Sequence, residues 1–391
     1  MLVSRSLNGG QSWGAVPITL IKDDAGQVLN DKNSLTADPN VSDFAYAVWD
    51  RLRDFTLPPS ASAKAKPLPK GAIHAKAGSG DGVAAARERR KQLLELGGGD
   101  ISPPGIPTFF EGPAYFSRTT NGGNTWKKPK IIFDPGPNAQ TINNIVVVQP
   151  DGEVYDFFTH IFFSGQVRIG FVKSADKGVT FGGESLAQEI HSFGAVTPDT
   201  QQPIRDASIL FDVAVDRHNG NIYLVWQDIR FGGIEQVAFS MSTNGGLTWS
   251  PPVAINQTPI SPANPLRRQA IIPSIEVADN GKLIVTYYDF RNDVNGPVEL
   301  TDHWAVFCDP ATANCRKRQD WGHELKLTKN SFDIAEAPVA RGLFLGDYMG
   351  LVASGNIVYP AFGVVDGAQE TSIFTRPIDV TGPPVVAATQ R

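Results

Sequence analysis

The stretch STNGGLTW at residues 242–249 decides the fold of this 391-residue chain, because its pattern occurs four times. The frame is a hydroxyl residue, any residue, Asn or Asp, any residue, Gly, any residue, a hydroxyl residue and an aromatic. In such a frame the Asn or Asp bonds to the backbone ahead of it, and the Gly takes a left-handed turn. The aromatic then packs the hairpin onto its neighbour. The other copies cover residues 6–13, 119–126 and 174–181.

The spacing of the copies indicates the size of the structural unit in which each copy lies. The aromatics that end the last three copies, Trp126, Phe181 and Trp249, are 55 and 68 residues apart. These intervals fit one four-stranded antiparallel blade for each copy. The interval from Trp13 to Trp126 is longer because it contains residues 53–111, which carry no strand pattern. The sequence therefore predicts an all-β fold with an insertion at 53–111.

A second repeat supports the blades. Three β-rich runs each close on an aromatic, an Asp and an Arg, and each follows a turn. A related segment near the C-terminus, beginning at Gly346, lacks the Arg. The three closing motifs are Asp50-Arg51, Asp228-Ile229-Arg230 and Asp289-Phe290-Arg291.

We expect residues 1–391 to form a single six-bladed β-propeller of four-stranded antiparallel blades. One blade, near residues 268–330, lacks the repeat, and the C-terminal segment supplies three strands from Tyr348 to Val380. Residues 1–5 read as the third strand of a blade. The first or last blade is therefore expected to be split between the termini or incomplete, or an upstream segment is missing.

Composition limits the function classes. Abundant Gly and Pro (38 and 29 residues) suit many short strands and turns, and the length allows a sizeable core. The net charge of −5 gives no reason to expect nucleic acid or an anionic membrane surface as a partner. No apolar run reaches 18 residues, so no membrane span is expected. No signal peptide is visible, and no cofactor is expected.

The only two cysteines, Cys308 and Cys315, bracket a six-residue loop. A disulfide in a secreted, periplasmic or cell-surface protein is the favoured interpretation, and two free thiols are the alternative. No zinc site is expected, because His303 and His323 are the only histidines nearby and four ligands are needed.

The insertion at 53–111 has two parts. Its first part is rich in Pro, Ala, Ser, Gly and Lys, which is typical of a mobile segment. Its second part predicts a short helix over Val83–Leu96 that ends at three glycines. A lid or an arm that docks a protein partner is one interpretation. A tolerated surface insertion is the other and the favoured one, because long loops cost little free energy.

The repeated frame resembles the Asp-box of sialidases and related β-propellers. This resemblance implies a six-bladed fold, three arginines that bind a glycan carboxylate, a Tyr nucleophile with a Glu partner, and an Asp acid/base. An Arg fork matches both oxygens of a planar carboxylate. The family's Arg-Ile-Pro segment and its acid/base Asp precede the first Asp-box. Only five residues precede it here, so both are absent from this chain.

The resemblance carries over to a few positions. Gly346-Asp347-Tyr348 resembles the segment that holds the family's nucleophile, which makes Tyr348 the matching residue, with Asp347 beside it. Glu276 is the only Glu on an adjacent inner strand, although its mid-strand position makes it a doubtful partner. Six arginines are candidates for binding a central ligand: Arg205, Arg268 and Arg341 at the openings of first strands, and Arg51, Arg230 and Arg291 in the Asp-Arg motifs.

The Asp-Arg motifs have a second interpretation. A catalytic residue is needed once, whereas a structural residue recurs with the repeat. We therefore expect these three arginines to form ion pairs with their own aspartates or with a neighbouring loop.

Two functions stay open at this stage. The first is a sialidase-type retaining glycoside hydrolase with an incomplete catalytic set. The second is a non-catalytic Asp-box propeller that binds a glycan, another carboxylate-bearing ligand or a protein at its central face. Fold alone decides neither, because function depends on the site.

Overall fold

The structure is a computed structural model that describes residues 1–23, 28–56, 108–162 and 164–387. The chain divides into two compact halves, an N-terminal half, Met1–Leu186, and a C-terminal half, Ala187–Arg391. In the described part the elements are β-strands and three short 3-10 helices, which confirms the all-β prediction. None of these helices is long or apolar enough to cross a membrane.

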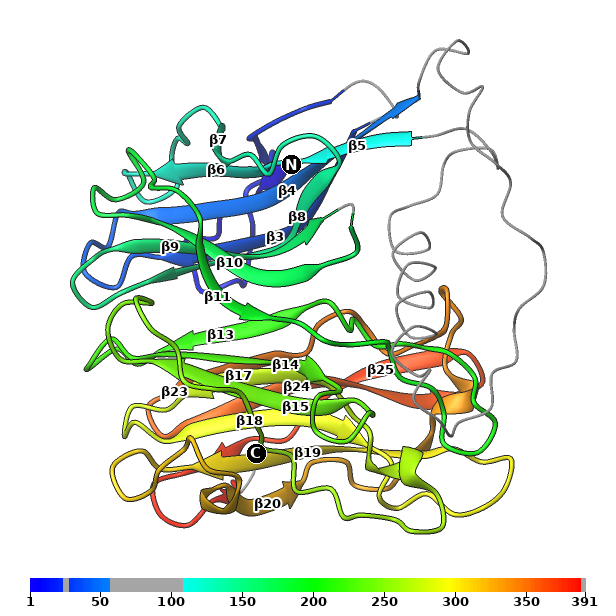
Figure 1. The fold of residues 1–391 in the computed structure, drawn as a ribbon. Coiled ribbons are helices and arrows are strands. Elements are labelled where there is room, and N and C mark those ends of the chain that lie inside the picture. Colours follow the sequence, from blue (N-terminus) through cyan, green and yellow to red (C-terminus); the bar gives the residue numbers. More distant parts are fainter. Residues whose placement is uncertain (24–27, 57–107, 163, 388–391) are drawn as a thin grey trace. The chain divides into compact units, whose positions relative to one another are not determined.

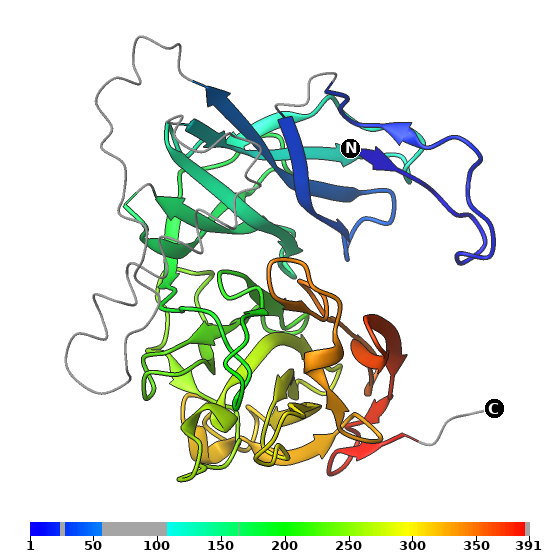
Figure 2. The same ribbon diagram turned by 90° about the vertical axis from the view of Figure 1, so that its right-hand side faces the viewer.

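The N-terminal half contains two four-stranded antiparallel meanders and a two-stranded ribbon (Figure 1). Meander 1 pairs β3 (Val28–Ala37), β4 (Ala45–Thr56), β6 (Ala114–Thr119) and β7 (Lys130–Phe133) in that order. Meander 2 pairs β8 (Ala139–Val148), β9 (Val154–Phe162), β10 (Val167–Ser174) and β11 (Ser185–Glu189). The ribbon joins β1 (Leu2–Val3) to β2 (Ile18–Thr19), and Figure 2 shows it in dark blue beside the N-terminus.

The ends of the 53–111 insertion differ from the prediction. β4 continues to Thr56, and β5 (Thr108–Gly112) pairs with this continuation, with Arg53 opposite Glu111 and Thr56 opposite Thr108. β5 also pairs in parallel with the start of β8, which joins the two meanders into one sheet. The prediction that 53–111 holds no strand is therefore wrong at both ends. Residues 57–107, with the helix expected at Val83–Leu96, lie outside the described residues.

The C-terminal half contains three more meanders. Meander 3 consists of β13 (Phe211–Val215), β14 (Ile222–Asp228), β15 (Gln236–Ser242) and β16 (Val253–Ala254). Meander 4 consists of β17 (Ala270–Val277), β18 (Leu283–Asp289), β19 (Leu300–Cys308) and β20 (Gly322–Lys326). It forms the unit expected near 268–330, which lacks a copy of the eight-residue frame. β21 (Phe332–Asp333) adds to β19.

Meander 5 confirms the predicted C-terminal strands. β23 (Gly350–Ser354) pairs with β24 (Ile357–Gly367), and the third strand is split into β25 (Glu370–Thr375) and β26 (Ile378–Asp379). The split falls at Pro377, which has no backbone N–H to donate to the ladder. A fourth strand, β27 (Val385–Val386), was not predicted.

The inner strands of the meanders carry the core. Every residue of β14 and β18 is buried, as expected for strands covered on both faces. Their largest side chains, Trp226, Tyr287 and Tyr288, have no exposed surface. In the N-terminal half Trp49 and Phe157 have the same role.

The repeats at 119–126, 174–181 and 242–249 each join the third and fourth strands of a meander, and the repeat at 6–13 joins the two strands of the ribbon. We call these four hairpins the repeat turns. In the turn at 242–249, Asn244 Oδ1 accepts a hydrogen bond from Thr248 N at 3.0 Å, and its Nδ2 donates to Thr248 Oγ1 at 2.8 Å. Ser242 Oγ accepts from Gly246 N at 2.9 Å. The same bonds recur in the turns at 6–13, 119–126 and 174–181, with Asp176 accepting both bonds in the last.

The burial expected for the aromatics of the repeat turns is wrong. Trp126, Phe181 and Trp249 are half-buried, and Trp13 is 61% exposed. Each aromatic is the last residue of its turn. The closest packing is that of Phe181, whose ring centroid lies 5.0 Å from that of the buried Phe116.

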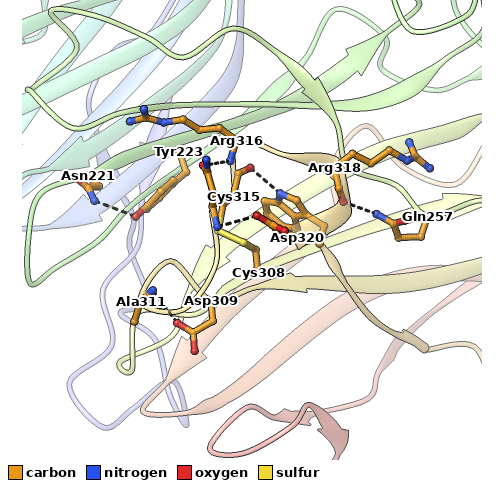
Figure 3. Close-up of a disulfide and its surroundings, with 12 residues drawn as sticks. Asn221, Tyr223, Gln257, Cys308, Asp309, Ala311, Cys315, Arg316, Arg318 and Asp320 are labelled. Carbon is orange, nitrogen blue, oxygen red and sulfur yellow. Dashed lines mark hydrogen bonds between the residues drawn. A yellow bond between two sulfur atoms is a disulfide. The ribbon is translucent and has the colours of Figure 1, made fainter.

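The predicted disulfide is present (Figure 3). Cys308 ends β19 and bonds to Cys315, with the two Cα atoms 5.9 Å apart. Both half-cystines are buried beside Trp321, whose Nε1 donates to the carbonyl of Cys315 at 2.8 Å. The disulfide therefore fixes the six-residue loop against the core.

Candidate functional site

Two short strands meet in the C-terminal half and build the centre of the candidate site. β12 (Ile204–Arg205) runs parallel to β22 (Leu343–Phe344), with Arg205 opposite Phe344. Gly342 makes the approach feasible, because a Cβ at this position would lie 2.7 Å from the backbone nitrogen of Arg205. Its φ of 141° also disfavours any other residue.

This pairing brings three of the predicted site residues together. Arg205 donates to both oxygens of Asp347, from Nε at 2.8 Å and from Nη2 at 2.7 Å. The guanidinium also lies 4.5 Å from the ring centroid of Phe344, within reach of a cation–π contact. Tyr348 follows Asp347 in the chain and is 48% exposed. We call these residues the Arg205–Asp347–Tyr348 cluster.

Two further candidate arginines lie elsewhere in the C-terminal half. Arg341 is exposed, two residues before β22, and has a left-handed φ of 64°. Arg268 ends the 3-10 helix η1 (Pro265–Arg268), and its Nε is buried with no hydrogen-bond partner among the described residues. Burial and the nearby charge of Arg268 lower the pKa of Arg318, which places these two cations close together.

A buried polar network starts at the residue next to Arg205. Asp206 Oδ2 accepts from Ala195 N at 2.5 Å and from Gln227 Nε2 at 2.8 Å. Gln227 Oε1 in turn accepts from Ile272 N at 2.8 Å. Ile272 has a φ of 52°, which is a strained conformation for a β-branched residue. The network therefore holds a strained backbone position at the start of meander 4.

Glu235 forms an acid pair with Asp206. Glu235 Oε1 accepts three hydrogen bonds, from Ser192 Oγ, Phe193 N and Gly194 N at 2.7–2.9 Å, while Oε2 has no partner among the described residues. Burial and the charge of Asp206 raise the pKa of Glu235 to about 8. Burial raises the pKa of Asp206 to about 6. Burial and mutual repulsion therefore favour retention of a proton by the pair.

The Asp-Arg motifs form ion pairs, as expected for a recurring structural element. Arg230 Nε donates to Asp228 at 2.8 Å, and Arg291 Nε donates to Asp289 at 2.7 Å. Arg51 departs from the pattern, because its guanidinium binds Asp23 in the β2–β3 connection. Its own Asp50 is fully buried, and within the described ranges neither of its carboxylate oxygens has a hydrogen-bond partner.

Arg291 is half-buried and makes several charged contacts. It binds Glu324 through two nitrogens, at 2.6 and 2.8 Å, and its guanidinium lies 3.9 Å from the Trp304 ring centroid. Tyr287 also bonds to Glu324, and its hydroxyl is fully buried. We assign this cluster a structural role, because Tyr287 has no exposed surface with which to contact a ligand.

Glu276 contacts the backbone near the end of β23. Its carboxyl accepts from Val277 N at 2.8 Å and interacts with the backbone of Ala353. Ala353 lies near the end of β23, whereas Tyr348 precedes the start of this strand. Ala353 follows Tyr348 by five positions, which would span about 16 Å in an extended chain, so Glu276 gains no support as a partner of Tyr348.

Among the residues that the structure describes, no group of three or more His, Cys, Asp or Glu side chains is arranged to hold a metal ion. Gln227 and Glu235 were not predicted as site residues. Neither belongs to a repeated motif, and their roles depend on contacts with distant segments.

Comparison with solved structures finds a match with a TM-score above 0.5, which supports the fold. A protein of unknown function from Dyadobacter fermentans matches with a TM-score of 0.52 and 12% identity, over 95% of this chain and 81% of that one. A sialidase from a Hadza microbial source matches with a TM-score of 0.47 and 15% identity, over 95% of this chain and 58% of its own. An intramolecular trans-sialidase from Ruminococcus gnavus matches with a TM-score of 0.47 and 11% identity, over 98% and 88%. No family model matches the chain, and no curated protein matches it.

Proposed function

We propose that this chain is a sialidase-like β-propeller that recognises a glycan at the Arg205–Asp347–Tyr348 cluster. One observation carries the proposal: an exposed aromatic lies next to an Arg–carboxylate pair at the junction of two distant segments. Sugars present both apolar C–H faces and hydroxyl groups. A half-exposed aromatic suits the first, and fixed charged donors and acceptors suit the second.

The proposal includes a six-bladed single domain. Five four-stranded meanders and the β1–β2 ribbon support this count, because the ribbon supplies the third and fourth strands of one further blade. The repeat turns support membership of the Asp-box group, since all four share one hydrogen-bond pattern.

The ion pairs of Arg205, Arg230 and Arg291 favour recognition of sugar hydroxyls over a clamp for a carboxylate by these three arginines. A ligand carboxylate would have to compete with Asp347 for Arg205, with Asp228 for Arg230 and with Glu324 for Arg291. Replacing an existing charge-assisted bond by another of the same kind yields little net binding energy.

Hydrolysis is the second candidate function, and the exposure of Tyr348 beside Asp347 and Arg205 favours it. For the phenol to attack at neutral pH, a carboxylate must take its proton and positive charge must stabilise the phenolate, because an ordinary phenol ionises near pH 10. Asp347 and Arg205 supply both kinds of charge. However, their mutual ion pair weakens Asp347 as a base.

We further propose that the protein is secreted, periplasmic or displayed on the cell surface. The Cys308–Cys315 disulfide supports this location, because disulfides persist in oxidising compartments. The arm for a protein partner proposed at 53–111 depends on residues 57–107, outside the described part of the chain.

The test combines a binding assay and an activity assay on the full chain. Binding to an array of neutral and sialylated glycans is compared for the wild type, Tyr348→Ala and the control Tyr359→Ala. Tyr359 is also an exposed tyrosine of meander 5. We expect binding to be lost only in Tyr348→Ala; equal binding by all three proteins would refute the site.

A fluorogenic sialoside separates the two functions. Turnover by the wild type that Tyr348→Phe abolishes and Tyr359→Phe retains would establish the hydrolase. Glycan binding without turnover would establish the binding protein. Neither binding nor turnover would overturn the proposed function as a whole.

A further inference from the structure

Four of the eight residues that line a small cavity in the N-terminal half are cations. It has a volume of about 190 Å³ and lies where the repeat turn of meander 2 packs onto β6 and β7 of meander 1. The lining residues are Arg118, Lys127, Lys128, Lys130, Phe116, Ser117, Gly178 and Val179. We call this the cationic cavity.

The cavity exists because the turn approaches the strand unusually closely. Gly178 lies over Phe116, where a Cβ would come within 2.3 Å of the ring, and Phe181 meets the same ring edge-on. Phe116 and Val179 supply an apolar wall. The cations come from the facing parts of β6, β7 and the turn between them.

The cations of the cavity have no carboxylate paired with them in the part of the chain that the structure describes. Arg118 donates to the carbonyl of Lys177, and Lys130 donates to the carbonyl of Val179. Both cations are thereby held in place by neutral acceptors. Lys127 and Lys128 are exposed at the rim.

Lys130 is held among apolar groups and next to another cation. Its Nζ lies 5.8 Å from the Phe116 ring centroid and 5.5 Å from that of Phe181. Burial and the charge of Arg118 lower the pKa of Lys130. The cavity therefore contains like charges that repel each other, and a bound anion would relieve this repulsion.

Asp176 is the acidic group whose charge raises the pKa of Lys130, but its carboxylate is hydrogen-bonded within its own turn. Its carboxylate accepts hydrogen bonds from Thr180 Oγ1, Thr180 N and Ser174 Oγ at 2.6–2.8 Å, which close its own turn. These bonds lower the pKa of Asp176. Its charge raises the pKa of Lys130 less than Arg118 and burial lower it.

We propose that the cationic cavity binds a phosphate or sulfate group carried on a larger ligand. The volume is below the roughly 300 Å³ at which whole small-molecule sites begin, so the cavity suits a charged group whose remainder lies outside. Lysine ammonium groups donate in three directions rather than in one plane, which suits a tetrahedral oxyanion. This proposal is independent of the proposed function, because none of its residues belongs to the Arg205–Asp347–Tyr348 cluster.

The test is calorimetric titration of the full chain with inorganic phosphate, inorganic sulfate and chloride at matched ionic strength. We expect saturable binding of phosphate or sulfate that weakens as salt rises, and none of chloride. The double variant with Lys127→Gln and Lys128→Gln removes only exposed rim charges, so it should fold. Its affinity should fall about two- to fivefold for each charge removed.

A second variant tests Arg118, one of the two cations that donate to backbone carbonyls. Arg118→Gln should lower the affinity about tenfold or more, because it removes a charge-assisted donor from a half-buried position. Lys329→Gln, at an exposed site of the C-terminal half, is the control and should bind as the wild type does. Unchanged affinity in the rim double variant, or equal heats for chloride, would overturn the proposal.

Titration with glucose 6-phosphate and glucose 6-sulfate then shows whether the cavity binds a phosphate ester or a sulfate ester of a sugar. Tighter binding of one ester than of its inorganic ion assigns the cavity to that group on a sugar. If neither ester binds while the inorganic ions do, the group is not presented on a larger ligand and the proposal fails in that part.

Discussion

Substituting Gly178 measures how much free energy depends on the close contact between the meander 2 repeat turn and Phe116. Gly178→Ala would place a Cβ 2.3 Å from Phe116 Cζ on a backbone with a φ of +80°. The left-handed conformation costs an L-residue about 1–2 kcal/mol. Part of this cost is offset, by about 0.4–1 kcal/mol, because Ala restricts the unfolded chain more than Gly does.

Gly10 occupies the same position in the first repeat turn and serves as the matched control. Its φ is +86°, and the nearest atom to a Cβ there is a carbon of Trp13 at 3.9 Å. Gly10→Ala should therefore cost only the conformational part, about 1 kcal/mol. Gly178→Ala should cost a further 1–3 kcal/mol or so, because the buried Phe116 ring must shift.

The assay is equilibrium unfolding in urea for both variants, with Phe116→Leu and the double variant completing a cycle. A smaller side chain at 116 should recover part of the cost of Gly178→Ala, which gives a coupling free energy of the order of 1 kcal/mol. Equal destabilisation by Gly10→Ala and Gly178→Ala would refute the close-packing argument. So would a cycle without coupling.

Three further predictions concern stability. Arg230→Ala should lower the free energy of unfolding by about 1–2 kcal/mol and leave glycan affinity unchanged, because Asp228 keeps other donors in the fold. A large affinity loss at unaltered melting temperature would instead assign Arg230 to the site. Glu235→Gln should flatten the pH dependence of stability. In the folded wild type the pKa of Glu235 is about 8, so the carboxyl keeps its proton at pH values where the unfolded chain has lost it. The wild-type free energy of unfolding should therefore fall between about pH 4.5 and 8, by up to about 4 kcal/mol. Urea unfolding at pH 5, 7 and 8.5 measures this difference, and parallel profiles would contradict the raised pKa. Replacing both Cys308 and Cys315 by Ser should cost about 2–3 kcal/mol for a loop of this length, whereas an unchanged melting temperature would show that the loop needs no covalent closure.

The local parts of the fold could be predicted from the sequence. A repeat turn closes through bonds between residues two to four positions apart, such as Asn244 with Thr248, so its pattern is complete within eight letters. The disulfide was predictable for the same reason, since Cys308 and Cys315 are seven residues apart. The strands of meander 5 followed from their own alternation and turns.

The non-local parts could not be predicted. Arg53 pairs with Glu111 across the whole insertion, and nothing in either short segment indicates the other. The exposure of Trp13 depends on which strand its turn meets, which the repeat pattern does not contain. Gln227 and Glu235 become important only because distant backbone groups reach them.

The parallel pair of β12 and β22 determines when the candidate site can form. Ile204 and Leu343 are neighbours in this pair, although 139 positions separate them in the chain. A ribosome adds about 5–20 residues each second, so Arg205 waits roughly 7–28 s for its carboxylate partner. During synthesis, meander 3 can fold with the guanidinium of Arg205 exposed to solvent. A nascent chain stalled before residue 343 would therefore hold a folded scaffold that lacks Asp347 and Tyr348, and the cluster would appear only with the last meander.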